Sequence, residues 1–124
     1  LCRYVSLIIL CSDLTKSCVP VCLNGTYGEN VTNKCVKQCP TGTYADDFLS
    51  LCVIDCDVGR SEFKDWSTNR CVKNCPSVPS LYAQNSTRSC VSFCDIGWFG
   101  LNTTRICTQS CPSPYYADIS TSFC

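Results

Sequence analysis

Cysteine dominates the chemistry that this sequence offers. The chain has 124 residues, of which 15 are cysteine and none is histidine. That density of cysteine in a short chain is typical of a disulfide scaffold from an oxidising compartment. Zinc sites usually use Cys-x2-Cys pairs, often with histidine, whereas every short spacing here is Cys-x3-Cys. We therefore expect disulfides, and neither a metal nor another cofactor.

Asparagine side chains offer a second chemistry, the attachment of N-linked glycans. Four Asn-x-Ser/Thr sequons are present, at Asn24, Asn30, Asn85 and Asn102. Three of them, Asn30, Asn85 and Asn102, lie five residues before a cysteine that ends a long loop. In a secreted protein such a sequon is a glycosylation signal, so we predict N-glycans at equivalent outward-facing turns.

Acid–base catalysis has little support in this sequence. A catalytic carboxylate pair such as Asp46 with Asp65 is less favoured than two solvated turn carboxylates, and Asp46, Asp47 and Asp118 lack the spacing of a calcium loop. There is no Gly-rich phosphate loop and no Cys-x2-Cys redox pair. Ten basic and ten acidic residues balance, so nothing favours a nucleic acid partner. We expect a protein that is not an enzyme.

The cysteines also define an internal repeat. From Cys18 onward, Cys-x3-Cys pairs alternate with loops of 12 or 14 residues. Eight residues before the cysteine that closes each loop stands an aromatic residue: Tyr27, Tyr44, Phe63, Tyr82, Phe99 and Tyr116. The cysteine spacing of 18–52 recurs in 90–124, a pattern that a longer parent chain could continue. Such regularity predicts tandem modules, six of them within residues 19–124.

Each loop has the features of a β-hairpin. An aromatic-bearing strand is followed by a polar turn, such as Ala45-Asp46-Asp47 or Gln84-Asn85-Ser86, and by a short return strand. A disulfide across a loop of about 14 residues contributes roughly 3 kcal/mol in the chain-entropy model. We expect the aromatic residue to pack on a disulfide or on the neighbouring module. The predicted fold is small, disulfide-rich and mostly β, an elongated rod of tandem disulfide-closed β-hairpin modules.

We predict that the second cysteine of each short pair joins the first cysteine of the next pair. The pairs are Cys22–Cys35, Cys39–Cys52, Cys56–Cys71, Cys75–Cys90, Cys94–Cys107 and Cys111–Cys124. An interlocked alternative joins Cys18–Cys35 and Cys22–Cys39, and so on along the chain. Spacing alone does not choose between the two.

Residues 1–18 form an irregular N-terminal module. Cys2 would open a loop that Cys18 closes, with Leu10 at the aromatic position, and this leaves Cys11 as the odd cysteine. Pairing of Cys2 with Cys11, or of Cys11 with Cys18, is also open. An odd cysteine indicates an intermolecular bond or a partner outside the chain. Because the chain starts at Leu1, we expect a processed form or part of a longer product.

The N-terminal module contains the longest apolar run of the chain, which includes Tyr4, Val5, Leu7, Ile8 and Ile9. The run is far shorter than the roughly 18–20 residues of a transmembrane segment. It fits a strand of the first module. The alternative hypothesis is that it adds to the sheet edge of the next copy, which would make the chain a filament subunit.

Two segments resemble a known family. Cys71-Val72-Lys73-Asn74-Cys75-Pro76 and Cys35-Val36-Lys37-Gln38-Cys39-Pro40 are similar to furin-like repeats, the cysteine-rich repeats of growth factor receptors. The resemblance covers 18–124 and is to the single-disulfide rod modules of that family, which also occur in protist surface proteins. It implies the sequential disulfide pairing, and it says little about function.

Two functions fit these features. We favour an extracellular, glycosylated structural protein that self-associates as a rod-like subunit of a surface fibre, filament or coat. The alternative is a receptor or adhesion ectodomain on the cell surface that binds a protein ligand, with Trp66, Trp98 and Phe99 as first contact candidates.

Overall fold

The computed structural model describes residues 10–12, 17–23 and 25–124, and the described residues form strands, turns and loops without a helix. Two strands precede the six predicted modules, β1 (Leu10–Ser12) and β2 (Ser17–Val19). The others are β3 (Tyr27–Glu29), β4 (Lys34–Val36), β5 (Tyr44–Asp46), β6 (Leu51–Val53), β7 (Phe63–Asp65), β8 (Arg70–Val72), β9 (Tyr82–Gln84), β10 (Ser89–Val91), β11 (Phe99–Leu101) and β12 (Ile106–Thr108).

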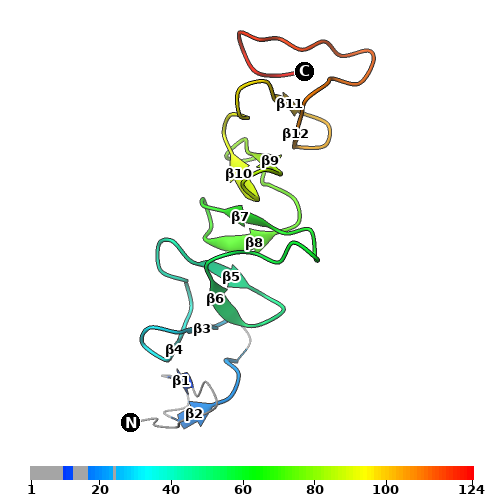
Figure 1. The fold of residues 1–124 in the computed structure, drawn as a ribbon. Coiled ribbons are helices and arrows are strands. Elements are labelled where there is room, and N and C mark those ends of the chain that lie inside the picture. The colour runs from blue at the N-terminus through cyan, green and yellow to red at the C-terminus, as the bar shows by residue number, and fades with distance from the viewer. Residues whose placement is uncertain (1–9, 13–16, 24) are drawn as a thin grey trace. The chain divides into compact units, whose positions relative to one another are not determined.

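The chain divides into two compact units, and Figure 1 shows the short strands of which each is built. Unit 1 comprises residues 1–56 and 68–71, and unit 2 comprises residues 57–67 and 72–124. In unit 1, β5 pairs with β6, β6 with β3, β3 with β4, β4 with β1, and β1 with β2. In unit 2 the corresponding order is β7, β10, β9, β12, β11.

The hairpins in the described part of the chain share one strand register. The first strand begins eight residues before the closing cysteine, at the predicted aromatic position, and the return strand is centred on that cysteine. Gly28 lies opposite Cys35 and Ala45 lies opposite Cys52. In the first hairpin Leu10 starts β1 and Cys11 lies opposite Cys18. The strand pairing keeps a fixed distance from the closing cysteine. The aromatic residue eight positions before that cysteine is therefore the first residue of its strand.

Neighbouring hairpins join by a second rule. The residue just before a closing cysteine pairs in parallel with the residue seven positions before the closing cysteine of the preceding hairpin, as in Gly28↔Leu51 and Ala83↔Ile106. The N–H of that earlier residue donates to the carbonyl two residues before the later cysteine, Gly28 to Ser50 and Ala83 to Arg105, each at 2.8 Å. Each hairpin thus continues the sheet of the hairpin before it.

That carbonyl belongs to a residue with left-handed backbone, which we call the left-handed position. It is occupied by Asn33, Ser50, Asn69, Arg88, Arg105 and Ser122, with φ between 51° and 60°. Only a minority of residues other than glycine adopt this conformation. Its recurrence in six loops means that the same turn closes every module.

The six sequential disulfides predicted for residues 22–124 are present. Their Cα–Cα distances are 5.5–5.7 Å, within the usual range of the bond. The predicted small, mostly β fold of tandem disulfide-closed hairpins is therefore confirmed, and the interlocked alternative is wrong.

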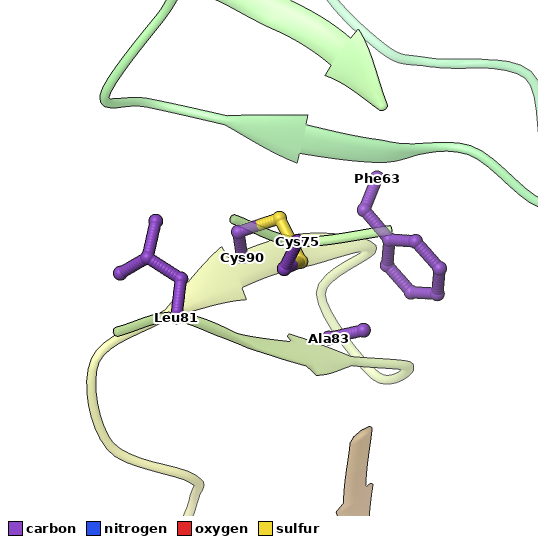
Figure 2. Packing of buried hydrophobic residues seen from close by; sticks show 5 residues of the cluster. All are labelled: Phe63, Cys75, Leu81, Ala83 and Cys90. Carbon is purple, nitrogen blue, oxygen red and sulfur yellow. A yellow bond between two sulfur atoms is a disulfide. The ribbon is translucent and has the colours of Figure 1, made fainter. Parts of the chain in front are cut away.

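The hydrophobic cores are small clusters built around a disulfide. Phe63 of one module packs with Cys75, Leu81, Ala83 and Cys90 of the next, and Figure 2 shows the Cys75–Cys90 bond between Leu81 and the Phe63 ring. Figure 2 thus gives the predicted packing of an aromatic residue on a neighbouring disulfide.

The other clusters repeat this arrangement. Tyr27 packs with Cys39, Ala45 and Cys52, and Tyr82 packs with Cys94 and Cys107. In each case the aromatic residue belongs to one module and the disulfide to the next. Each of these hydrophobic clusters is therefore formed by two successive modules.

The sixth module differs from the other five. Its strands are reduced to isolated bridges that join Phe123 to Asp118 within the module and to Gly100 in β11. Gly100 accommodates this close approach, because an added Cβ would lie 2.9 Å from the Phe123 ring and 3.0 Å from that of Tyr82.

Candidate functional site

In unit 1, the modules closed by Cys35, Cys52 and Cys71 share a network of polar and aromatic side chains. The Tyr27 hydroxyl donates to Asp47 at 2.5 Å, and Arg70 donates to both oxygens of Asp47 at 2.6 and 2.8 Å. The Arg70 guanidinium also lies 5.6 Å from the centre of the Tyr27 ring. The network joins side chains from three successive modules.

Unit 2 contains equivalent arrangements. Arg88 stacks over Phe63 at 4.2 Å and Arg105 over Tyr82 at 5.1 Å, measured to the ring centres. Arg88 also donates to the Glu62 carbonyl at 2.8 Å. A cation over an aromatic face adds attraction to the burial of the ring. Because the arginine comes from the module after the ring, these stacks clamp one module on the next.

The electrostatics of the unit 1 network favour its charged form. The hydrogen bond from Tyr27 and the neighbouring Arg70 lower the pKa of Asp47 below its usual value. Burial and the hydrogen bond to Asp47 raise the pKa of Tyr27, and the carboxylate raises the pKa of Arg70. Asp47 thus stays ionised while Tyr27 stays protonated, as a structural hydrogen bond requires. Neither group has the pKa of a general base near neutrality.

The acidic residues predicted to lie in solvated turns are buried instead. Asp46 and Asp65 are 2% and 1% exposed, so the prediction of solvated carboxylates at these positions is wrong. Each ends its first strand, six residues before the closing cysteine, and accepts hydrogen bonds from the turn that follows. Asp46 accepts from the N–H groups of Phe48 and Leu49 at 2.9 and 3.0 Å. These contacts pin the turn.

The same position has the same role in other modules. Glu29 accepts from the N–H groups of Val31 and Thr32, and Asp118 accepts from Ser120. Hydrogen bonds from the hydroxyls of Thr32 and Ser120, followed by those from the N–H groups, lower the pKa of Glu29 and Asp118. Among the residues that the structure describes, no cluster of acidic side chains and cysteines has the form of a metal site. The two predicted polar turns begin later than expected: the first begins at Asp47, two residues after Ala45, and the second at Asn85, one residue after Gln84.

Three of the four sequons lie in equivalent turns. Asn30, Asn85 and Asn102 are exposed, each just after the first strand of its module. Asn102 Oδ1 accepts a hydrogen bond from the Tyr82 hydroxyl, and Asn85 Oδ1 accepts from Arg88 at 3.3 Å. N-glycosylation uses the amide nitrogen, so a glycan is compatible with both contacts. Asn24 lies outside the described residues.

The aromatic contact candidates differ in exposure. Trp66 is 55% exposed in the turn of the third module. Trp98 and Phe99 are only half-buried, and Trp98 packs against the cluster of Tyr82, Cys94 and Cys107. Of the three, Trp66 offers the most surface to a partner.

The N-terminal predictions are described only in part. Cys2 and the apolar residues Tyr4, Val5, Leu7, Ile8 and Ile9 lie outside the described residues, as does the Cys11 side chain. Cys18 is in a disulfide. The partner choice among Cys2, Cys11 and Cys18 therefore stays as the sequence leaves it.

Comparisons with family models, with curated proteins and with solved structures found no match. Within the described part of the chain, no helix has the length and hydrophobicity needed to cross a membrane. The disulfides and modules define a protein of tandem cysteine-rich repeats. Such an architecture suggests an extracellular protein, because its disulfides persist in oxidising compartments.

The arginine stacks were not predicted from the sequence, although a signal was present. Arg70, Arg88 and Arg105 stand one or two residues before a closing cysteine. Once hairpins are joined in the register above, that position lies beside the aromatic ring of an earlier module. The distance of each arginine from its closing cysteine would have predicted the stacks if the parallel pairing between modules had been known.

Proposed function

We propose that this chain is an extracellular, glycosylated structural protein that acts as a subunit of a surface fibre, filament or coat. We also propose that it has no catalytic activity and that its modules are related to the furin-like repeats that the sequence resembles. The uniformity of the module junctions carries this proposal.

The junctions support a structural role because they repeat with little variation. The N–H groups of Ala45 and Lys64 donate to the carbonyls at the left-handed positions of the following modules, Asn69 and Arg88, each at 2.8 Å. A dedicated ligand site usually breaks a repeat pattern in one module, whereas a spacer or a fibre needs every junction to resist separation. The rings of Tyr27, Phe63 and Tyr82, which could have formed a binding surface, instead pack on the disulfide of the next module.

A receptor or adhesion ectodomain is the second candidate, and exposed Trp66 favours it. Tryptophan is enriched among the residues that dominate binding at interfaces. Trp66 stands at the turn position where three other modules carry a sequon asparagine. If this function holds, Trp66→Ala will weaken the binding of a protein ligand without changing the state of assembly.

Electron microscopy of the native protein, with and without reductant, tests the first proposal. Regular fibres are expected under non-reducing conditions. Their loss in reductant would show that disulfides maintain the assembly, and Cys11 would be the first residue to substitute. Single particles at every concentration under both conditions would contradict the fibre proposal and favour the ectodomain.

A further inference from the structure

Two of the sequon asparagines contact residues that join modules. In unit 2, the Asn102 oxygen Oδ1 accepts a hydrogen bond from the hydroxyl of Tyr82, which belongs to the preceding module. Asn85 Oδ1 accepts from Arg88 at 3.3 Å, and the Arg88 guanidinium lies 4.2 Å from the centre of the Phe63 ring, again in the preceding module. The amide oxygen of each asparagine thus faces the protein.

Tyr82 lies at the centre of the junction between the fourth and fifth modules. Its side chain is 3% exposed, and the guanidinium of Arg105, from the fifth module, lies 5.1 Å from the centre of its ring. The next residue, Ala83, donates its N–H to the Arg105 carbonyl at 2.8 Å and pairs in parallel with Ile106. The hydrogen bond to Asn102 is therefore one of several contacts that join these two modules.

The second module carries an aspartate at the equivalent turn position. Asp47 accepts from the Tyr27 hydroxyl at 2.5 Å. A carboxylate has two equivalent oxygens, so it presents an acceptor whichever way the group turns. An amide has one oxygen and one NH2 group, so Asn102 accepts from Tyr82 in only one of its two orientations. In the other orientation the NH2 group faces the tyrosine hydroxyl, whose proton then loses this acceptor.

An N-linked glycan fixes the orientation of the amide. The sugar is attached to Nδ2, and Oδ1 and Nδ2 point in different directions from Cγ. Because Tyr82 is buried, a sugar on Nδ2 has no room on the side where the hydroxyl meets Asn102. Nδ2 must then point to solvent, and Oδ1 is held toward Tyr82.

We propose that an N-glycan at Asn102 stabilises the junction between the fourth and fifth modules, by holding the Asn102 amide in the orientation that accepts from Tyr82. This role rests on the proposed function, which includes glycosylation. It gives the glycan a second task, since the modification strengthens a contact between modules as well as covering the turn. A single sugar residue is enough for this task, because the first sugar alone fixes the amide.

Amide hydrogen exchange at Ala83 provides the measurement, because its N–H donates across this junction to Arg105. The full-length, oxidised protein is produced in a host that adds oligomannose glycans. Thr104→Ala gives the same chain without the Asn102 glycan but with the asparagine retained, and Thr104 is exposed. We expect the glycan to slow exchange at Ala83 by about twofold, the factor gained when one of two equally populated amide orientations is removed.

Two controls separate this effect from a general effect of the glycan. The Gly28 N–H donates to Ser50 across the equivalent junction in unit 1, so its exchange should not depend on the Asn102 glycan. In Tyr82→Phe the ring remains but the hydroxyl is absent. The glycan should therefore no longer slow exchange at Ala83 in that variant, when proteins with and without Thr104→Ala are compared in both backgrounds.

Enzymatic trimming tests whether the attachment itself or the bulk of the glycan matters. Endoglycosidase H removes all of an oligomannose glycan except the sugar residue linked to the asparagine. Because that residue alone fixes the amide, the trimmed protein should keep the slower exchange at Ala83. Mass spectrometry of non-reduced peptides confirms that each variant forms the Cys75–Cys90 and Cys94–Cys107 bonds.

The outcomes distinguish the junction role of the glycan from the proposed function. If the Asn102 peptide carries no glycan in the glycosylating host, the proposed glycosylation of this turn is wrong and the junction role with it. If the glycan is present, three results would each show that only the junction role is wrong. They are equal exchange at Ala83 with and without the glycan, the same slowing in Tyr82→Phe, and loss of the slowing after trimming.

Discussion

At the scale of single residues, this protein uses polar side chains where a larger protein would use a hydrophobic core. Each cluster has one buried aromatic ring, a disulfide and a few further side chains, which in the cluster of Tyr82 include Trp98 and Phe123. Such clusters bury little surface, so contacts between modules matter more to stability. The arginine stacks and the hydrogen bonds of Tyr27 and Tyr82 supply those contacts.

The hydroxyl of Tyr27 provides a test of these contacts. Tyr27→Phe keeps the ring beneath Arg70 but removes the hydrogen bond to Asp47. We expect the free energy of unfolding, measured in urea with the disulfides intact, to fall by roughly 0.5–1.5 kcal/mol. Tyr116→Phe is the control, because the Tyr116 side chain is exposed and its substitution should leave the urea midpoint unchanged.

The same substitution alters the pH dependence of stability. The folded-state pKa of Asp47 lies below its usual value of 3.8, chiefly because Tyr27 donates to it. Its contribution is therefore present above the unfolded pKa and is lost as the pH falls through the lower, folded pKa. Tyr27→Phe should raise the pKa of Asp47 in an NMR titration. An unchanged pKa would mean that Arg70 alone keeps Asp47 ionised.

Sequence reasoning succeeded for the aromatic residues and failed for the acids. The aromatic position was identified because it recurs at a fixed distance from a cysteine. Acidic residues next to a polar turn usually face water, so the sequence predicts solvated carboxylates at Asp46 and Asp65. Their burial depends on N–H groups that the turn presents only after it forms, as with Phe48 and Leu49 around Asp46. No pattern of residue types reveals that geometry.

At the scale of elements, the repeated unit is a hairpin whose turn is fixed at both ends. The buried acid holds the start of the turn, and the left-handed position holds its end. The carbonyl at that position also receives the hydrogen bond from the preceding module. The turn therefore determines both the hairpin and the junction.

The left-handed backbone of Ser50, whose φ is 53°, leads to a prediction about stability. Ser50→Gly should raise the urea midpoint, because glycine adopts this backbone without the strain of a side chain and the carbonyl bonded to Gly28 remains. Ser50→Val should lower the free energy of unfolding by about 1–2 kcal/mol, since a β-branched residue is strongly disfavoured there.

A glycine substitution elsewhere in the same module separates relief of backbone strain from the added flexibility of the unfolded chain. Thr41 lies in the same module and is exposed, and its φ is not positive. Thr41→Gly should lower stability, because it only adds freedom to the unfolded chain. If Ser50→Gly were destabilising to the same extent, strain at the left-handed position would not be relevant to stability.

The hairpins themselves were predictable because cysteine spacing, aromatic position and turn composition agree in every loop. The junctions were not, since parallel pairing between Gly28 and Leu51 involves residues that no spacing singles out. The sixth module was expected to match the others, yet its strands are isolated bridges.

At the scale of the whole molecule, the surface combines zero net charge with exposed apolar side chains. Ten basic and ten acidic residues cancel. Val31, Ile96 and Ile119 are each at least 87% exposed. A net charge near zero and exposed apolar residues both promote association. These properties fit the proposed assembly of the chain. Specific assembly also requires that some surfaces stay free of contacts. Glycans at the equivalent turns would cover such surfaces.

The Asn102 turn allows the glycan and the side-chain contact to be tested separately. In a glycosylating host we expect glycans at Asn30, Asn85 and Asn102, detected by peptide mass spectrometry after enzymatic deglycosylation. Thr104→Ala destroys the third sequon but keeps the Asn102 oxygen that accepts from Tyr82, whereas Asn102→Ala removes both. Both variants should lose one glycan, but only Asn102→Ala should also lose roughly 0.5–1.5 kcal/mol of stability relative to Thr104→Ala. Equal stability of the two variants would mean that the Tyr82 contact does not hold the modules together. A mass decrease in Thr104→Ala no larger than that of the substitution itself would show that Asn102 carries no glycan.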